Sequence, residues 1–329
     1  MSMISRRHFG IAGLGLIGGA GLVPTGLLAQ TQDRQARQLK LVVPFPGGVL
    51  DMMTREVGAV MAASLAQTLV VENKPGASGM VAVAEVLGRP ADGQTLLLGH
   101  IGTHAINPAI FGKLNYRPQE DFLPVSLLAS TPIVLLVSAA LPVRNLKELQ
   151  AYAKSHPDGL NYGSPGVGSS GHLAGELLKQ KAGIAMTHVP YKGASQAMQD
   201  LLGGQVQLSV DTLSGALPQL AGGKIRAIAL AARQRSLLAP DLATLEEQGV
   251  ALDMGPWFGL FARSGTPAAE VQRLAHAAQQ ALQQPELAER LRSRGLLLVG
   301  NTPAEFTGFV QVEAQRWAAV ARAAGIKPE

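Results

Sequence analysis

Short apolar segments alternate with helical patterns along most of this 329-residue chain, and that alternation limits the folds open to it. Strands separated by helices at this spacing are typical of α/β proteins, in which helices cover parallel sheets. We predict strands at residues 39–45, 68–73, 94–100, 160–164, 186–191, 205–210, 224–231 and 257–262. The helical patterns between them lie at residues 51–66, 77–88, 145–155, 172–183 and 194–204.

One long apolar segment, residues 123–143, carries no charge and is long enough to span a bilayer. It contains Pro124, Pro132 and Pro142, however, and it is rich in β-branched residues. Prolines break helices, and β-branched runs are typical of buried strands. We therefore predict two core strands that are separated at Thr131-Pro132, in preference to a membrane helix.

The order of strand, glycine-rich turn, helix and strand restarts after this segment, which indicates two α/β lobes. Residues 267–324 have a mostly helical pattern, and we expect this tail to pack back on the first lobe. The chain then crosses between the lobes near residues 132–140 and 254–260. The predicted lobes are 30–134 with 257–329 (lobe 1) and 135–256 (lobe 2).

The N-terminus has the pattern of an export signal. Ser5-Arg6-Arg7-His8-Phe9 is a twin-arginine pattern, and a glycine-rich apolar run without charge follows it to about Ala29. The alternative is a chance arginine pair before a buried helix. We predict that residues 1–29 are a twin-arginine signal peptide, cleaved near Ala29-Gln30, and that the protein is periplasmic.

Composition disfavours several classes of function. The formal net charge is only +5 and there is no run of Lys or Arg, so nucleic-acid binding is not expected. The chain has no cysteine, which excludes disulfides, thiolate zinc sites and a cysteine nucleophile. A mild positive charge suits anionic small ligands.

The stretch 161–178, NYGSPGVGSSGHLAGELL, contains Gly166, Gly168 and Gly171 in the spacing G-x-G-x-x-G between a predicted strand and a predicted helix. A dinucleotide site would also need an acidic residue at the end of the next strand, and none follows residues 186–191. The G-x-S-x-G elbow of serine hydrolases is missing as well. A glycine-rich loop that opens a helix can bind another anion through free N–H groups.

Two other loops carry candidate residues. In PFPGGVLDMMTR (44–55), Asp51 is either a helix cap or a ligand contact. In GHIGTHAINP (99–108), His100 and His104 have the i, i+4 spacing of a zinc pair, but the glycines and Asn107-Pro108 indicate a loop, and ordinary polar loop residues are the better interpretation.

At these residues the chain resembles the solute receptors of tripartite tricarboxylate transporters, the TctC or Bug type. The motifs that carry the resemblance are PFPGGVLDMMTR, THAINPAIF, NYGSPGVGSSGHLAGELL, HVPYKGASQAMQDLLGGQVQ, VDTLSGALPQLAGGKIRAIA and WFGLFARSGTPAAE, in order over the whole predicted mature chain. The resemblance implies a type II periplasmic-binding-protein fold with two lobes and a two-crossing hinge. It implies a non-enzymatic, monomeric receptor without cofactor or metal, which delivers a small organic carboxylate to membrane transporter subunits.

The resemblance also implies a set of ligand-binding residues on loops of both lobes. These are Phe45, Pro46, Gly47, Gly48, Gly102, Thr103, His104, Ser164, Gly168, Ser169, Ser170, His172, Tyr191, Lys192, Gly193, Ala194 and Asp211, and we add Asp51 as the candidate contact from the first loop. Leu50 departs from the family, because many relatives have Thr or Asn before the helix-opening Asp. A periplasmic nicotinamide-dependent oxidoreductase that uses the Gly166-Gly168-Gly171 loop stays the alternative, and a sensory receptor without a transporter is a further possibility.

Overall fold

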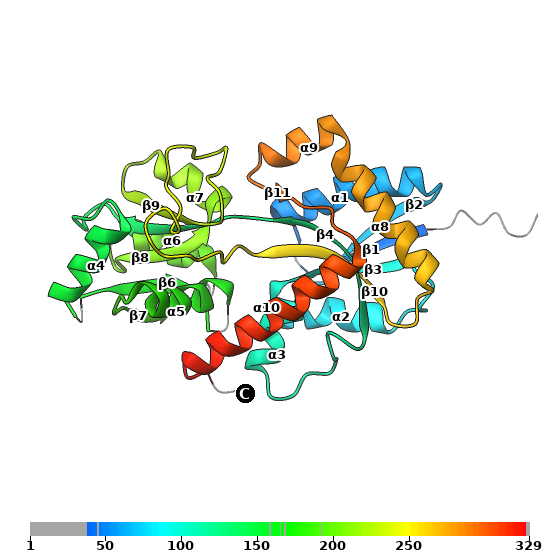
Figure 1. The fold of residues 1–329 in the computed structure, drawn as a ribbon, viewed down its shortest axis with the longest axis horizontal. Helices are drawn as coiled ribbons and strands as arrows, with labels where there is room; N and C mark the ends of the chain where they lie inside the picture. Colours follow the sequence, from blue (N-terminus) through cyan, green and yellow to red (C-terminus); the bar gives the residue numbers. More distant parts are fainter. Residues whose placement is uncertain are drawn as a thin grey trace, which may run out of the picture. The chain divides into compact units, whose positions relative to one another are not determined.

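The computed structural model describes residues 38–326 except 45, 158, 165, 168 and 192, together with the backbone but not the side chains of residues 48 and 49. The predicted signal peptide lies outside the described residues. Residues Ala36–Glu329 form one compact unit built around two sheets, each flanked by helices (Figure 1). The mixed α/β architecture of the prediction is confirmed.

The first sheet has six strands in the order β11-β4-β10-β3-β1-β2. Strand β1 is parallel to β2 and β3, whereas β10 runs antiparallel to both β3 and β4. The sheet is therefore mixed, not parallel as the alternation suggested. Its strands are β1 (Gln38–Val43), β2 (Thr68–Asn73), β3 (Thr95–His100), β4 (Phe122–Ser130), β10 (Trp257–Arg263) and β11 (Leu297–Leu298).

Helices cover both faces of this sheet (Figure 1). One face packs against α1 (Gly48–Ser64), α8 (Ala268–Gln283) and α9 (Pro285–Arg292) around a core that includes Met53 and Leu274. The elements of the other face are η1 (Ala77–Gly79), α2 (Met80–Leu87), η2 (Gly102–Ile106), α3 (Asn107–Ile110) and α10 (Pro303–Ala323). The C-terminal helices α8, α9 and α10 thus pack on the first sheet.

The second sheet has five strands in the order β7-β6-β8-β5-β9. Strand β6 is parallel to β7 and β8, and β5 is antiparallel to β8 and β9. Its strands are β5 (Ile133–Ser138), β6 (Asn161–Ser164), β7 (Thr187–Pro190), β8 (Leu208–Thr212) and β9 (Ile225–Ala231). Its helices are α4 (Leu146–Ser155), α5 (Ser170–Ala182), α6 (Ala194–Leu202) and α7 (Leu213–Leu220).

The long apolar segment forms β4 and β5, which belong to different sheets and are separated at Thr131-Pro132, as predicted. The second crossing precedes β10, at Gly255-Pro256. The two crossings touch, because the backbone N–H of Thr131 donates to the carbonyl of Pro256 at 3.0 Å. Ile133 already pairs with Thr212 and Ala231 of the second sheet, so the chain leaves the first sheet shortly before the predicted boundary at residue 134. No helix among the described residues is long and apolar enough to cross a membrane.

Helix α10 connects the two parts of the fold. It contacts β4 of the first sheet and α5 of the second, and in Figure 1 it is the red helix that runs between them. Trp317 and Val320 of α10 belong to the same apolar cluster as Leu173 and Leu177 of α5. This cluster makes the core continuous from one sheet to the other.

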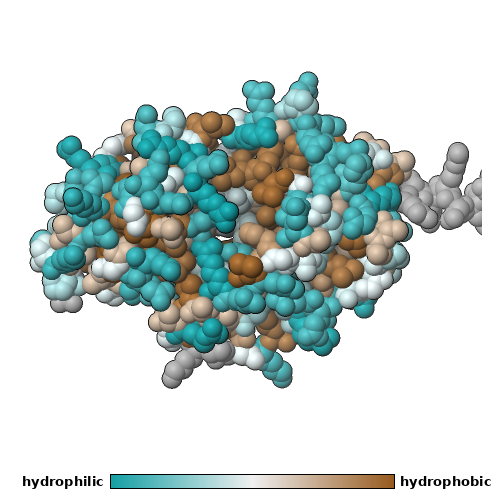
Figure 2. All heavy atoms as spheres, in the orientation of Figure 1, coloured by the Kyte–Doolittle hydropathy of each residue, from teal (hydrophilic) through white to brown (hydrophobic). Residues whose placement is uncertain are grey.

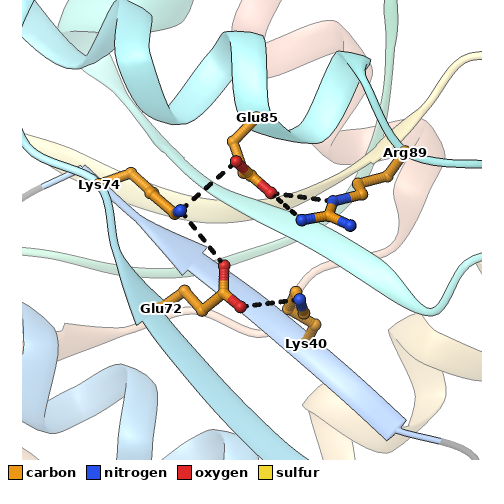
Figure 3. Close-up of polar contacts among 5 residues, drawn as sticks. All are labelled: Lys40, Glu72, Lys74, Glu85 and Arg89. Carbon is orange, nitrogen blue, oxygen red and sulfur yellow. Dashed lines mark hydrogen bonds and ion pairs between the residues drawn. The ribbon is translucent and has the colours of Figure 1, made fainter.

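Two surface features accompany the first sheet. Alternating charges link β1, the end of β2 and α2 (Figure 3): Glu72 binds Lys40 at 2.7 Å, and Lys74 lies 3.7 Å from Glu72 and 3.5 Å from Glu85, which also pairs with Arg89. Apolar side chains gather around β11 on the face shown in Figure 2, and β11 carries the exposed Leu297.

Candidate functional site

A cavity of about 820 Å³ is lined by residues from both halves of the fold. Residues of the first sheet's loops and helices meet residues that follow β6 and β8 of the second sheet, and both crossings contribute. The lining residues are Gly47, Leu50, Ser78, His100, Ile101, Gly102, Ile106, Asn107, Ile110, Phe111, Thr131, Val167, Ser169, Ser170, Thr212, Ser214, Gly215, Pro256 and Phe258.

Three helices start at this cavity. Helix α1 follows Gly47, whose φ of 69° lies in the left-handed region that favours glycine. Ser169 caps α5 by accepting the N–H of His172, and Thr212 caps α7 by accepting the N–H of Gly215. The first N–H groups of a helix lack partners within the helix, and the helix dipole places positive potential there. Three such starts around one cavity suit an anion.

The described lining residues include no Asp, Glu, Lys or Arg. His100 is the one titratable side chain among them, and burial lowers its pKa to about 4, which keeps the ring neutral at pH 7. Its Nδ1 accepts the N–H of Gly102 at 2.9 Å. The positive potential of the described lining thus comes from backbone dipoles, and Lys192 lies outside the described residues.

Asp51 is not in the lining. Its carboxylate accepts hydrogen bonds from Arg55 Nε at 3.0 Å and from Asn73 Nδ2 at 2.7 Å. The bond from Arg55, with help from Asn73, lowers the pKa of Asp51 despite its partial burial. Leu50, the preceding residue, lines the cavity instead.

Ser164 and His172 lie behind the glycine-rich loop. Ser164 is fully buried, and its hydroxyl forms a 2.6 Å hydrogen bond with His188 Nε2. The His188 ring stacks on His172 with ring centroids 3.9 Å apart. In front of them, Ser169 Oγ donates to the carbonyl of Gly166 at 2.7 Å. This arrangement supports the loop from behind while Ser169 lines the cavity.

Thr103 and His104 are turned into the core. His104 stacks on Phe261 with ring centroids 3.6 Å apart, and its Nδ1 lies 2.9 Å from Thr103 Oγ1. The segment 102–106 is a π-helical turn, not the loop that the sequence suggested, and Asn107-Pro108 begins the short helix α3. Within residues 38–326, as far as they are described, no group of three His, Cys, Asp or Glu side chains could hold a metal ion.

The side chains of two further predicted residues, Tyr191 and Asp211, form hydrogen bonds with neighbouring residues of the protein. Tyr191 donates its hydroxyl hydrogen to Asp200 at 2.7 Å. Asp211 accepts the N–H of Thr212 at 2.7 Å, and burial raises the pKa of its carboxyl group.

The cavity therefore brings together Gly47, Gly102, Ser169 and Ser170 of the predicted set. Pro46, Gly193 and Ala194 are not in the lining, Gly48 is the first residue of α1, and Phe45, Gly168 and Lys192 fall outside the described residues. The prediction missed the apolar side chains and the start of α7. Thr212 could have been found, because Asp-Thr-Leu-Ser-Gly after a strand is another helix-start pattern.

Of the glycines of the G-x-G-x-x-G pattern that the structure describes, Gly166 follows β6 and Gly171 lies in the first turn of α5. The next strand, β7, is parallel to β6, as in a dinucleotide-binding unit. However, the chain after Pro190 continues Tyr191-Lys192-Gly193-Ala194, and a ribose-binding acid is missing at that point.

Comparison with known proteins gives consistent results. A family model described as the tripartite tricarboxylate transporter family receptor matches residues 53–326. The protein BugT of Bordetella pertussis is 34% identical over 295 residues, which cover 89% of this chain and 90% of BugT. Among solved structures, R. palustris Rpa4515 with adipate has a TM-score of 0.78 at 37% identity, covering 90% of this chain and all of that one. MatC from Rhodopseudomonas palustris with bound malate has a TM-score of 0.72 at 38% identity, covering 87% of this chain and 99% of MatC.

Proposed function

Because the chain belongs to the receptor family of tripartite tricarboxylate transporters, we propose that it captures a small organic carboxylate in the cavity between its two sheets. The captured carboxylate is then delivered to the membrane subunits of a transporter of that kind. The family is one of binding receptors, and the proposed role requires no chemical step.

The observation that carries this proposal is the cavity lined by the starts of α1, α5 and α7 without an acidic side chain among the described lining residues. Helix starts offer N–H donors and positive potential to a carboxylate. Water molecules that bridge carboxylate and backbone can replace an arginine clamp at little cost in free energy. The adipate held by Rpa4515 and the malate held by MatC support a carboxylate ligand.

We further propose that the twin-arginine pattern at Arg6-Arg7 exports the protein to the periplasm, where a receptor of this kind meets its ligand. The nicotinamide-dependent oxidoreductase is a competing prediction for the same loop. The missing acid after β7 disfavours it, and titration with nicotinamide cofactors tests it directly.

Ser169→Asp tests the carboxylate site. Asp is a good N-cap, so α5 should form as before. The new charge would face the ligand carboxylate in a partly desolvated cavity, and we expect binding to weaken by about 2 kcal/mol or more, which is roughly thirtyfold in Kd. The measurement is calorimetric titration with whichever carboxylate raises the melting temperature most in a panel of mono-, di-, tri- and aromatic acids, since ligands that bind only the native state stabilise it.

Ser169→Asn is the matched control, because it has the shape and capping ability of Asp without the charge. It should bind the same carboxylate within a few-fold of the wild-type protein. Equal binding by both variants, with melting temperatures near that of the wild-type protein, would remove the start of α5 from the site.

A further inference from the structure

We infer that Thr131, in the first crossing between the two sheets, is a further ligand-binding residue whose hydroxyl group forms a hydrogen bond with an oxygen atom of the bound carboxylate. The inference rests on the proposed function and adds a named side-chain contact to it. Thr131 is not one of the residues that the sequence predicted for the site.

Thr131 combines burial with an unused hydroxyl group. It lines the cavity and is only 4% exposed, and its Oγ1 has no hydrogen-bond partner among the described residues. Other hydroxyl groups of the wall are committed to the protein: that of Ser169 donates to the carbonyl of Gly166, and that of Thr212 accepts the N–H of Gly215. Buried polar groups are nearly always paired, so an unpaired hydroxyl in a cavity wall indicates a partner that the ligand supplies.

The backbone holds Thr131 between the second crossing and the start of α7. Its N–H donates to the carbonyl of Pro256 at 3.0 Å, and the carbonyl of the next residue, Pro132, accepts the N–H of Leu213 at 2.9 Å. Pro132 also restricts the backbone of Thr131 to extended conformations. Rotation about the Cα–Cβ bond, which has three staggered positions, can turn the hydroxyl toward a ligand.

This position fits a contact with a carboxylate. Leu213 is the first residue of α7, so a ligand oxygen bound by Thr131 would lie near the start of that helix. The helix dipole places positive potential there, and a hydroxyl group adds a donor that carries no charge of its own. The bound carboxylate would thereby touch the first crossing as well as the helix starts.

Thr131→Val tests the contact, because valine keeps the shape of the side chain and lacks the hydroxyl group. For whichever of succinate, malate, adipate and citrate binds the wild-type protein most tightly, titration calorimetry should give a Kd at least about tenfold higher, since a hydrogen bond to a charged group is lost. The melting temperature without ligand should stay equal or rise, because folding no longer buries an unpaired hydroxyl. Thr131→Ser restores the hydroxyl group and should bind within about threefold of the wild-type protein.

Thr266→Val is the matched control. Thr266 is also buried, but its hydroxyl donates to the carbonyl of Arg263 at 2.7 Å, and it is not part of the cavity lining. This variant should show the opposite pattern, with a lower melting temperature and an unchanged Kd, because its hydroxyl serves the fold.

An unchanged Kd in Thr131→Val, or a fall in its melting temperature like that of Thr266→Val, overturns the inference alone. Equally weak binding by Thr131→Ser and Thr131→Val overturns it too, since the hydroxyl would then not be the group that matters. Binding of none of the four acids by the wild-type protein overturns it as well, and the wider carboxylate panel then decides whether the proposed function also fails.

Discussion

His188 shows how a single residue ties stability to pH. Its Nε2 is hydrogen-bonded to the buried Ser164, its ring stacks on His172, and Glu176 and Lys179 act on it from α5 with opposite signs. Burial, followed by the nearby His172, lowers the pKa of His188 to about 4, whereas an unfolded chain has the ordinary value of 6.5. The unfolded state therefore takes up a proton first as the pH falls. The stability that this neutral ring contributes is fully present above pH 6.5 and is lost between pH 6.5 and pH 4.

His188→Gln removes that titration and keeps a group that can hydrogen-bond to Ser164. Between pH 7 and pH 4 we expect the wild-type free energy of unfolding to fall more than that of the variant, by about 1–2 kcal/mol, because solvent screening of this half-buried ring reduces the value that the linkage relation gives. Urea unfolding at several pH values measures the difference. His276→Gln, at an exposed position on α8, is the control and should keep the wild-type pH dependence. Parallel curves for the wild-type protein and His188→Gln would contradict the prediction.

At the scale of elements, the carboxylate of Glu313 links α10 to the second crossing. Glu313 Oε2 accepts the indole N–H of Trp257 at 3.0 Å and that of Trp317 at 2.9 Å. Its other oxygen binds Arg316, whose guanidinium also contacts the carbonyl of Asp253. The helix that reaches from the first sheet to α5 thus also binds the residues just before and within β10.

Glu313→Leu would leave two buried indole N–H groups without an acceptor. We expect the free energy of unfolding to decrease by about 2–4 kcal/mol, because each unsatisfied buried donor costs about 1–3 kcal/mol. Glu313→Gln retains one acceptor oxygen and should lose clearly less. Trp257 and Trp317 are the two tryptophans of the chain, so their fluorescence reports the urea unfolding of α10 and the crossing together. Equal stability of the Leu variant and the wild-type protein would show that the carboxylate does not hold the two elements together.

At the scale of the whole molecule, the two crossings have to bend together if the cavity closes on a ligand. They are in direct contact at Gly255, where an added Cβ would lie 2.6 Å from the carbonyl oxygen of Thr131. Real Cβ atoms do not come that close to a backbone oxygen, so any larger residue at position 255 must push the crossings apart. Glycine is required at position 255 because there is no room for a Cβ atom, and not because the backbone has a positive φ angle there.

Gly255→Ala is therefore expected to change closure, and small-angle scattering measures it as the change in radius of gyration at saturating carboxylate. The wild-type protein should become more compact with ligand, and the variant should show a smaller change and a free energy of unfolding lower by about 1–3 kcal/mol. Gly308→Ala is the matched control, because a Cβ at that α10 position meets nothing within 4 Å. It should close like the wild-type protein and gain up to about 1 kcal/mol of stability from helix propensity. Identical compaction in both variants would contradict a role of position 255 in closure.

The sequence by itself determined the elements whose signals are local. Hydrophobic period belongs to neighbouring residues, so the predicted strands and the division at Thr131-Pro132 could be read before the fold was known. The family resemblance came from the same linear patterns and is confirmed by the match to residues 53–326.

Only the tertiary structure decided which of these elements meet and which way their side chains face. The antiparallel pairing of β10 with β3 and β4 joins segments far apart in the chain, and no local pattern specifies it. Leu50 and Asp51 are neighbours in sequence, yet one lines the cavity and the other binds Arg55 and Asn73. Successive residues of a helix point about 100° apart, so the rotation of α1 on its sheet, fixed by packing of the core, determines which residue meets the ligand.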